Sequence, residues 1–125
     1  MPHYKEIRIN TVPAYTVTIG PGLLRRCGPA LRSPVPPCRM AVVTDSIVGP
    51  LYLETVTESL KAAGYAVSAY EFPAGEGSKH FTTLSNILEF LAEEHLTRTD
   101  CLIALGGGVV GDMAGFAAAC YLRGI

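Results

Sequence analysis

The sequence has few charged residues and no long hydrophobic segment. Only 17% of its 125 residues are charged, whereas 49% are hydrophobic, so we expect a chain that folds around a sizeable core. The formal net charge is −1, and this lack of a basic excess argues against binding to nucleic acid or to an anionic membrane. No run of 18 apolar residues occurs, which argues against a membrane-spanning helix.

Signals for secretion and for metal binding are also missing. The first six residues are polar and lack the apolar stretch of a signal peptide. The cysteines show no CxxC spacing and the three histidines show no metal-ligand spacing, so we expect no metal site in residues 1–125. We interpret the cysteines as reduced, mostly buried residues of a cytoplasmic protein: Cys27, Cys38, Cys101 and Cys120.

The first part of the chain has the pattern of a hairpin. Residues 5–9 and 15–19 alternate polar and apolar side chains, which predicts two half-buried strands that pair as an N-terminal β-hairpin. Residues 23–27 indicate a short helix that ends at Gly28-Pro29, and residues 33–37 form a proline-rich loop.

After residue 38 the pattern indicates three strands that alternate with three helices. The expected strands are 39–44, 65–72 and 101–105, and the expected helices are 51–63, 81–94 and 109–122. This order predicts an α/β fold with a Rossmann-like parallel sheet and flanking helices. We expect one domain over residues 1–125, and we interpret the abrupt end of the sequence as a truncation.

The strongest chemical signal is the glycine-rich segment 106–112, which follows the third expected strand. Glycines let a backbone turn tightly and approach an anion, and a helix N-terminus offers free N–H groups. The segment matches G-x-G-x-x-G, but it does not follow the first strand, which weakens the interpretation as a typical NAD dehydrogenase. A tight turn whose glycines serve only packing remains the alternative.

Asp112 directly follows this segment. Its carboxylate suits the first turn of a helix, where it would favour the helix dipole. It would repel a phosphate at the same terminus, so we favour a role in accepting a hydrogen bond from a ribose hydroxyl or a nicotinamide amide.

Two further loops follow strands and should lie at the same edge of the sheet. Asp45 follows the first strand and is suited to a ribose diol, or it serves as a helix N-cap or forms an Asx turn. The loop 75–79 offers a carboxylate, a hydroxyl and an ammonium group, or it is a solvated loop in which Ser78 caps a helix. Arg123 is suited to a substrate phosphate or to capping a helix C-terminus.

Three segments resemble the 3-dehydroquinate synthases of the sugar-phosphate cyclase superfamily: residues 105–125 (LGGGVVGDMAGFAAACYLRGI), 73–79 (PAGEGSK) and 43–45 (VTD). The resemblance runs from about residue 5 to residue 125 and implies the N-terminal NAD-binding domain of such an enzyme. These enzymes are lyases that convert 3-deoxy-D-arabino-heptulosonate 7-phosphate to 3-dehydroquinate and phosphate in the shikimate pathway to chorismate and the aromatic amino acids. They use NAD and zinc or cobalt, and they are commonly homodimers.

The resemblance also assigns roles to residues. Asp45 would bind the adenosine ribose, Asp112 would lie near the nicotinamide, and Arg123 would reach the substrate phosphate. The nicotinamide-side ribose and amide would be lined by Gly75, Glu76, Gly77, Ser78 and Lys79. The pyrophosphate would lie on Gly107, Gly108, Val109, Val110 and Gly111. The metal ligands would belong to a helical C-terminal domain that is absent from residues 1–125, so we expect no catalytic residue within this chain and no turnover by it alone.

Three other functions remain open. The chain would also suit another sugar-phosphate cyclase that acts on a different phosphate sugar. A metal-dependent polyol dehydrogenase shares the glycine-rich turn and would release NADH, whereas a synthase shows no net reduction of its cofactor. A non-catalytic module would bind a nucleotide or only a protein partner.

Overall fold

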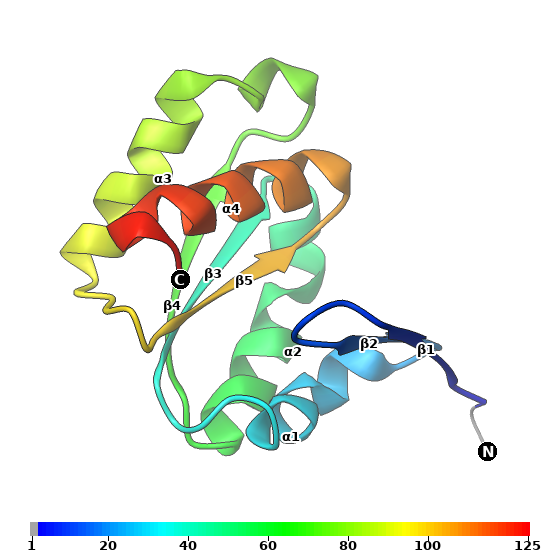
Figure 1. Ribbon diagram of the computed structural model, residues 1–125. Helices are drawn as coiled ribbons and strands as arrows, with labels where there is room; N and C mark the ends of the chain where they lie inside the picture. Colours follow the sequence, from blue (N-terminus) through cyan, green and yellow to red (C-terminus); the bar gives the residue numbers. More distant parts are fainter. Residues whose placement is uncertain (1–2) are drawn as a thin grey trace.

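Three parallel strands form the centre of the fold in the computed structural model, which describes residues 3–125 (Figure 1). The strands are β1 (Lys5–Ile9), β2 (Tyr15–Ile19), β3 (Arg39–Asp45), β4 (Ala66–Phe72) and β5 (Cys101–Leu105). The helices are α1 (Cys27–Arg32), α2 (Val48–Ala62), α3 (Phe81–Glu93) and α4 (Gly108–Cys120). Short 3-10 turns lie at Leu23–Arg26, Glu76–Ser78 and Tyr121–Arg123.

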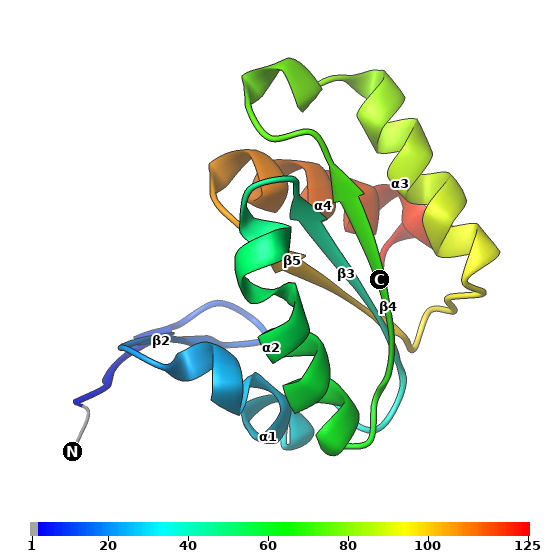
Figure 2. The same ribbon diagram turned by 180° about the vertical axis from the view of Figure 1, so that it is seen from behind.

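The strand order in the central sheet is β4-β3-β5, and both pairings are parallel. β3 lies in the middle, and its residues 40–44 have no exposed surface because both faces of the sheet are covered. The helices α1 and α2 cover one face, and α3 and α4 cover the other (Figures 1 and 2). The expected Rossmann-like parallel sheet with flanking helices is therefore confirmed.

The position of β3 has a consequence for function. The chain runs from β3 to β4 on one side and then returns to place β5 on the other side of β3. The connections that leave β3 and β5 thus diverge at the carboxyl edge of the sheet, and open α/β sheets bind their ligands in the crevice at such a switch point.

The strands β1 and β2 form a separate antiparallel hairpin with the expected bounds. Two helix predictions need correction. The helix expected over residues 23–27 is a 3-10 turn at Leu23–Arg26, and α1 follows it through Gly28-Pro29 to Arg32, because a proline in the first helical turn loses no intrahelical hydrogen bond. The helix expected from residue 51 begins at Val48, because the side chain of Asp45 binds its first backbone N–H groups.

Burial of the cysteines is only partly as expected. Cys27, Cys38 and Cys101 are half-buried, but Cys120 at the end of α4 is exposed, so the expectation of burial is wrong for that residue. Burial raises the pKa of the Cys101 thiol and that of Cys38, which disfavours the reactive thiolate at neutral pH. Across residues 3–125, the helices are too short or too polar to cross a membrane.

The side chain of Asp100 joins the starts of β3 and β5. One carboxylate oxygen accepts a hydrogen bond from the backbone N–H of Arg39 at 2.9 Å, and the other accepts one from the backbone N–H of Thr97 at 2.7 Å. Burial acts to raise the pKa of Asp100, but these hydrogen bonds outweigh it, and the pKa lies below its usual value of 3.8. The folded chain therefore favours the charged carboxylate.

Replacement of Asp100 by alanine is expected to lower the free energy of unfolding by about 1–3 kcal/mol at neutral pH, because two backbone N–H groups lose their charged acceptor. The folded-state pKa is lowered, so this stabilisation is complete above the unfolded pKa and is lost as the pH falls through the folded pKa. Urea unfolding should thus show a difference from the parent that shrinks below about pH 4. The exposed Glu93→Ala is the control, and an equal loss in both variants would contradict the assignment.

Candidate functional site

Three loops at the carboxyl edge of the sheet are held together by hydrogen bonds. The hydroxyl of Thr44 at the end of β3 is buried and donates to the carbonyl of Leu105 at the end of β5, at 2.7 Å. Ser46 then connects the loops after β3 and β4: its backbone N–H donates to the carbonyl of Phe72 at 2.9 Å, and its hydroxyl accepts from the N–H of Ala74 at 2.8 Å. The expectation that these loops share one edge of the sheet is therefore met.

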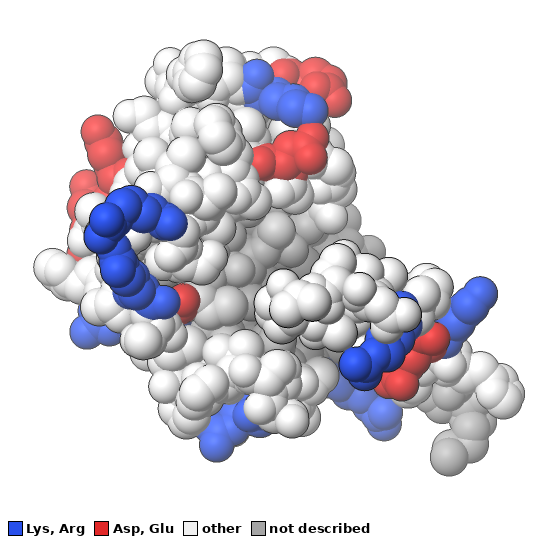
Figure 3. Space-filling model, in the orientation of Figure 1, with Lys and Arg blue, Asp and Glu red and all other residues white. Residues whose placement is uncertain are grey.

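An ion pair joins the loop after β4 to the start of α4. The Nζ atom of Lys79 lies 2.7 Å from Oδ2 of Asp112, although the two residues are 33 positions apart. The hydrogen bond to Asp112 raises the pKa of Lys79, and the negative charges of Asp112 and Glu76 raise it further. Figure 3 shows opposite charges in contact at the top of the molecule, near the start of α4.

The glycines of the segment 106–111 fall into two groups, according to the space around them. A Cβ atom on Gly106 would lie 2.6 Å from a methyl group of the buried Val110, so the packing of the chain itself requires glycine there. A Cβ atom on Gly107, Gly108 or Gly111 would meet no atom within 4 Å, and none of the three has a positive φ. Neither packing nor backbone conformation therefore requires glycine at these three positions. A ligand that approaches the backbone closely would require it.

The first turn of α4 lies beside this open space. Gly107 is the N-cap residue, and no side chain caps the helix, so the N–H groups of the first turn are free to bind an anion. The side chain of Val110 is fully buried in the core and that of Val109 is half-buried, so these residues offer a ligand chiefly their backbone N–H groups. The arrangement is suited to an anion.

Asp45 is placed at the end of β3, directly before α2. Its Oδ1 atom accepts hydrogen bonds from the N–H groups of Ile47 at 3.0 Å and Val48 at 2.8 Å, which is the pattern of an Asx turn. Ile47 is the N-cap residue of α2, so the N-cap alternative is wrong for Asp45. The bonds hold the carboxylate at the carboxyl edge of the sheet.

The loop 75–79 presents only part of its expected ligand set. Gly75 has φ of 107°, a conformation that favours glycine, and it starts the tight turn. Ser78 is buried, and its hydroxyl donates to the carbonyl of Pro73, so this side chain shapes the loop. Glu76, Gly77 and Lys79 are exposed and face solvent.

Arg123 is not part of this cluster. It follows α4, whose 13 residues begin at the carboxyl edge of the sheet and run back along it, a length of about 20 Å. Arg123 and its neighbour Leu122 both have positive φ values, 66° and 48°. The structure therefore brings together the loops that carry Asp45, Lys79 and the glycines, but it does not bring Arg123 to them.

A hollow beside the ion pair was not anticipated. It has a volume of about 320 Å³, and its lining consists of Lys79, His80, Phe81, Leu84, Asp112, Met113 and Phe116. Phe81 is 81% exposed, which is unusual for a large apolar side chain. In the sequence, the only signal was an aromatic residue at the start of a helix that follows a polar loop. No group of three potential metal ligands lies together within residues 3–125.

Comparison with known proteins finds similarity to one enzyme family. The sequence model of a family described as 3-dehydroquinate synthase N-terminal matches residues 69–125. The 3-dehydroquinate synthase of Streptococcus suis (strain 05ZYH33) is 47% identical over 111 residues, which are 89% of this chain and 31% of the relative. The chain thus spans about a third of the length of the curated relative it matches.

Solved structures agree on the fold. A 2-deoxy-scyllo-inosose synthase complexed with carbaglucose-6-phosphate, NAD+ and Co2+ has a TM-score of 0.82 at 24% identity, over 97% of this chain and 33% of that protein. At this identity the likeness concerns the fold alone. The 2-epi-5-epi-valiolone synthase from Streptomyces hygroscopicus subsp. jinggangensis 5008, with NAD+ and Zn2+ bound, has a TM-score of 0.69 at 30% identity, over 83% of this chain and 28% of that protein.

Proposed function

We propose that residues 1–125 form the NAD-binding domain of a 3-dehydroquinate synthase, because the model of that family's N-terminal part matches residues 69–125 and a curated synthase is 47% identical over 89% of this chain. The observation that carries the proposal is the open space over Gly107, Gly108 and Gly111, at a helix start without a side-chain cap. That space lies at the same edge of the sheet as Asp45 and the Lys79–Asp112 ion pair.

The proposed placement of NAD follows from the chemistry of each group. The first-turn N–H groups of α4 hold the pyrophosphate, and the free oxygen of Asp45 holds the adenosine ribose. The second ribose and the amide lie near Glu76, Lys79 and Asp112. Because Lys79 neutralises Asp112 at 2.7 Å, the carboxylate does not expose an uncompensated negative charge to the pyrophosphate.

The whole enzyme that we propose converts 3-deoxy-D-arabino-heptulosonate 7-phosphate to 3-dehydroquinate and phosphate, in the cytoplasm and as a homodimer. NAD supplies oxidation of a substrate hydroxyl and the later return of the hydride, so no cofactor is consumed. Residues 1–125 bind and orient that cofactor. Zinc or cobalt is held by residues outside this chain, and Arg123 serves the substrate phosphate at a distance from the nucleotide cluster.

Calorimetry with NAD and the purified 125-residue chain tests the proposal. We expect a single site that binds NAD, with no formation of 3-dehydroquinate by the chain alone in the presence of zinc or cobalt. An absence of heat and of any ligand-induced shift in the thermal midpoint at millimolar NAD would overturn the assignment. Net production of NADH from polyols would favour a dehydrogenase instead.

The ion pair provides a sharper test. Replacing Lys79 with methionine should raise the Kd for NAD about 10-fold, or about 1.4 kcal/mol, because the charge of Asp112 is then uncompensated beside the pyrophosphate. Asp112→Asn should weaken binding, because the neutral amide oxygen is a weaker acceptor than the carboxylate. Both side chains are largely exposed (45% and 60%), so neither change should alter the thermal midpoint appreciably.

Lys61→Met, at an exposed lysine in the last turn of α2, is the matched control for this ion pair. It removes the same charge from the chain and should leave the Kd unchanged. Equal effects of Lys61→Met and Lys79→Met would mean that only net charge matters, and the proposed site would then be wrong.

A further inference from the structure

One polar side chain lies inside the otherwise apolar part of the central strand β3. Thr44 has no exposed surface, and residues 40–43, which precede it, are buried and apolar. A hydroxyl in such surroundings costs free energy unless it forms a hydrogen bond, and that of Thr44 donates to the carbonyl of Leu105 at 2.7 Å. A valine has nearly the same shape and needs no partner, so packing alone does not explain a threonine at this position.

The acceptor of this hydrogen bond lies directly before the glycine-rich segment. Leu105 is the last residue of β5 and the register partner of Thr44. The carbonyl of Leu105 and the N–H of Gly106 belong to one planar peptide unit. A hydrogen bond that fixes the direction of the carbonyl therefore also fixes the direction of this N–H, and with it the way in which the chain enters the turn before α4.

The turn itself has few other contacts. A Cβ atom at Gly107 or Gly108 would meet no atom within 4 Å, so the turn is open on that side. Within residues 3–125, Thr44 provides the single side-chain hydrogen bond to residues 105–108. Glycine has more backbone freedom than any other residue, so a turn of three glycines needs such a contact to keep one conformation.

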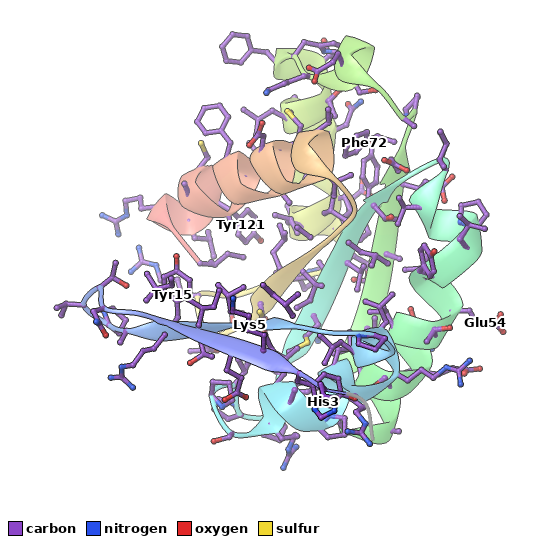
Figure 4. The ribbon with its side chains drawn as sticks, turned by 90° about the vertical axis from the view of Figure 1, so that its right-hand side faces the viewer. His3, Lys5, Tyr15, Glu54, Phe72 and Tyr121 are labelled. Carbon is purple, nitrogen blue, oxygen red and sulfur yellow. The ribbon has the colours of Figure 1, made fainter. Side chains whose placement is uncertain are left out.

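Helix α4, by contrast, is held by packing on the other face of the sheet. Val110 in its first turn belongs to the same buried cluster as Phe72, and Figure 4 shows Phe72 beside the start of α4. The side chain of Thr44 lies on the face covered by α2, where its methyl group lies 3.1 Å from the position that a Cβ atom of Gly49 would take. The methyl group of Thr44 thus faces α2, whereas its hydroxyl binds the start of the glycine turn.

We infer that Thr44 is a positioning residue for the dinucleotide: its hydroxyl holds the Leu105–Gly106 peptide so that the backbone N–H groups that follow face the open space. The inference rests on the proposed function, in which these N–H groups bind the pyrophosphate. Thr44 is fully buried and does not touch the ligand itself. A preorganised turn binds an anion without first having to be ordered, so loss of the hydroxyl weakens the affinity for NAD.

Two substitutions separate the hydroxyl of Thr44 from its methyl group. Thr44→Val keeps the shape and removes the hydrogen bond, so the Kd for NAD, measured by calorimetry on the 125-residue chain, should rise about 5-fold. Thr44→Ser keeps the hydroxyl and loses the methyl group, so its Kd should stay within about 2-fold of the parent value. Both variants should lower the thermal midpoint, the first by loss of a buried hydrogen bond and the second by loss of packing.

Val42→Ala is the matched control. Val42 lies on the same face of β3 as Thr44, is fully buried, and has no side-chain hydrogen bond to lose. It should lower the thermal midpoint and leave the Kd unchanged, with all variants measured at a temperature where they are folded. In two-dimensional amide NMR spectra, the signals of Gly106 and Gly107 should move in Thr44→Val and keep their parent positions in Thr44→Ser.

Several results would overturn the inference. A Kd for Thr44→Val equal to that of the parent would show that the hydroxyl serves stability only. Equal weakening by Thr44→Val, Thr44→Ser and Val42→Ala would mean that the affinity follows the overall stability of the fold. If the parent binds NAD and these expectations fail, only this inference is wrong, whereas a parent that does not bind NAD refutes the proposed function and this inference with it.

Discussion

Replacement of Gly108 by valine is expected to weaken NAD binding about 100-fold, or by about 3 kcal/mol, while the thermal midpoint stays the same or rises slightly. The valine side chain would enter space in which no atom of the chain lies within 4 Å of the new Cβ, so we expect no steric loss of stability. A branched side chain at the first position of α4 would, however, keep a pyrophosphate from the backbone N–H groups. Calorimetry and thermal unfolding of the same sample measure both quantities.

Gly106→Ala is the matched control and should have the opposite outcome. Its Cβ would lie 2.6 Å from the side chain of the fully buried Val110, so we expect a loss of about 1–3 kcal/mol in stability from overpacking. If Gly108→Val instead unfolds the chain and leaves the affinity for NAD intact in the remaining folded fraction, the glycines serve packing only. The interpretation of this segment as a dinucleotide site would then be wrong.

Replacement of Ile87 by alanine is expected to lower the free energy of unfolding by about 2–5 kcal/mol. Ile87 lies on α3 and has no exposed surface, and its cluster includes Ala41 and Val43 of β3 and Val110 of α4. A small domain has a total stability of about 5–15 kcal/mol, so this one change would remove a large share of it.

The same substitution should also weaken NAD binding, because α3 begins directly after the loop that carries Lys79. Urea unfolding measures the loss of stability, and calorimetry at a temperature where the variant is still folded measures the affinity. Glu89→Ala, at an exposed position of the same helix, is the control and should change neither quantity by much. A small effect of Ile87→Ala on stability would show that this cluster is not the core of the domain.

Local patterns were sufficient for most of the secondary structure. The strands at 5–9, 15–19 and 101–105 have their expected bounds, because alternation or a short apolar run marks them clearly. The errors lie where a side chain or a neighbouring helix acts on the backbone. α2 begins early because the N–H of Val48 donates to the side chain of Asp45. α1 runs through Gly28-Pro29, where the N–H of Gly28 donates to the hydroxyl of Ser59 on α2 at 3.0 Å.

The candidate site shows the same division. The glycine spacing and the helix start that follows residues 101–105 are visible in the sequence itself, because both are local patterns of residues. Three features depend on packing between distant segments: the Lys79–Asp112 ion pair, the burial of Ser78, and the separation of Arg123 from the other residues by the length of α4. These features depend on which strand edges pair and on the length of the covering helix. Neither property can be read from the order of the residues alone.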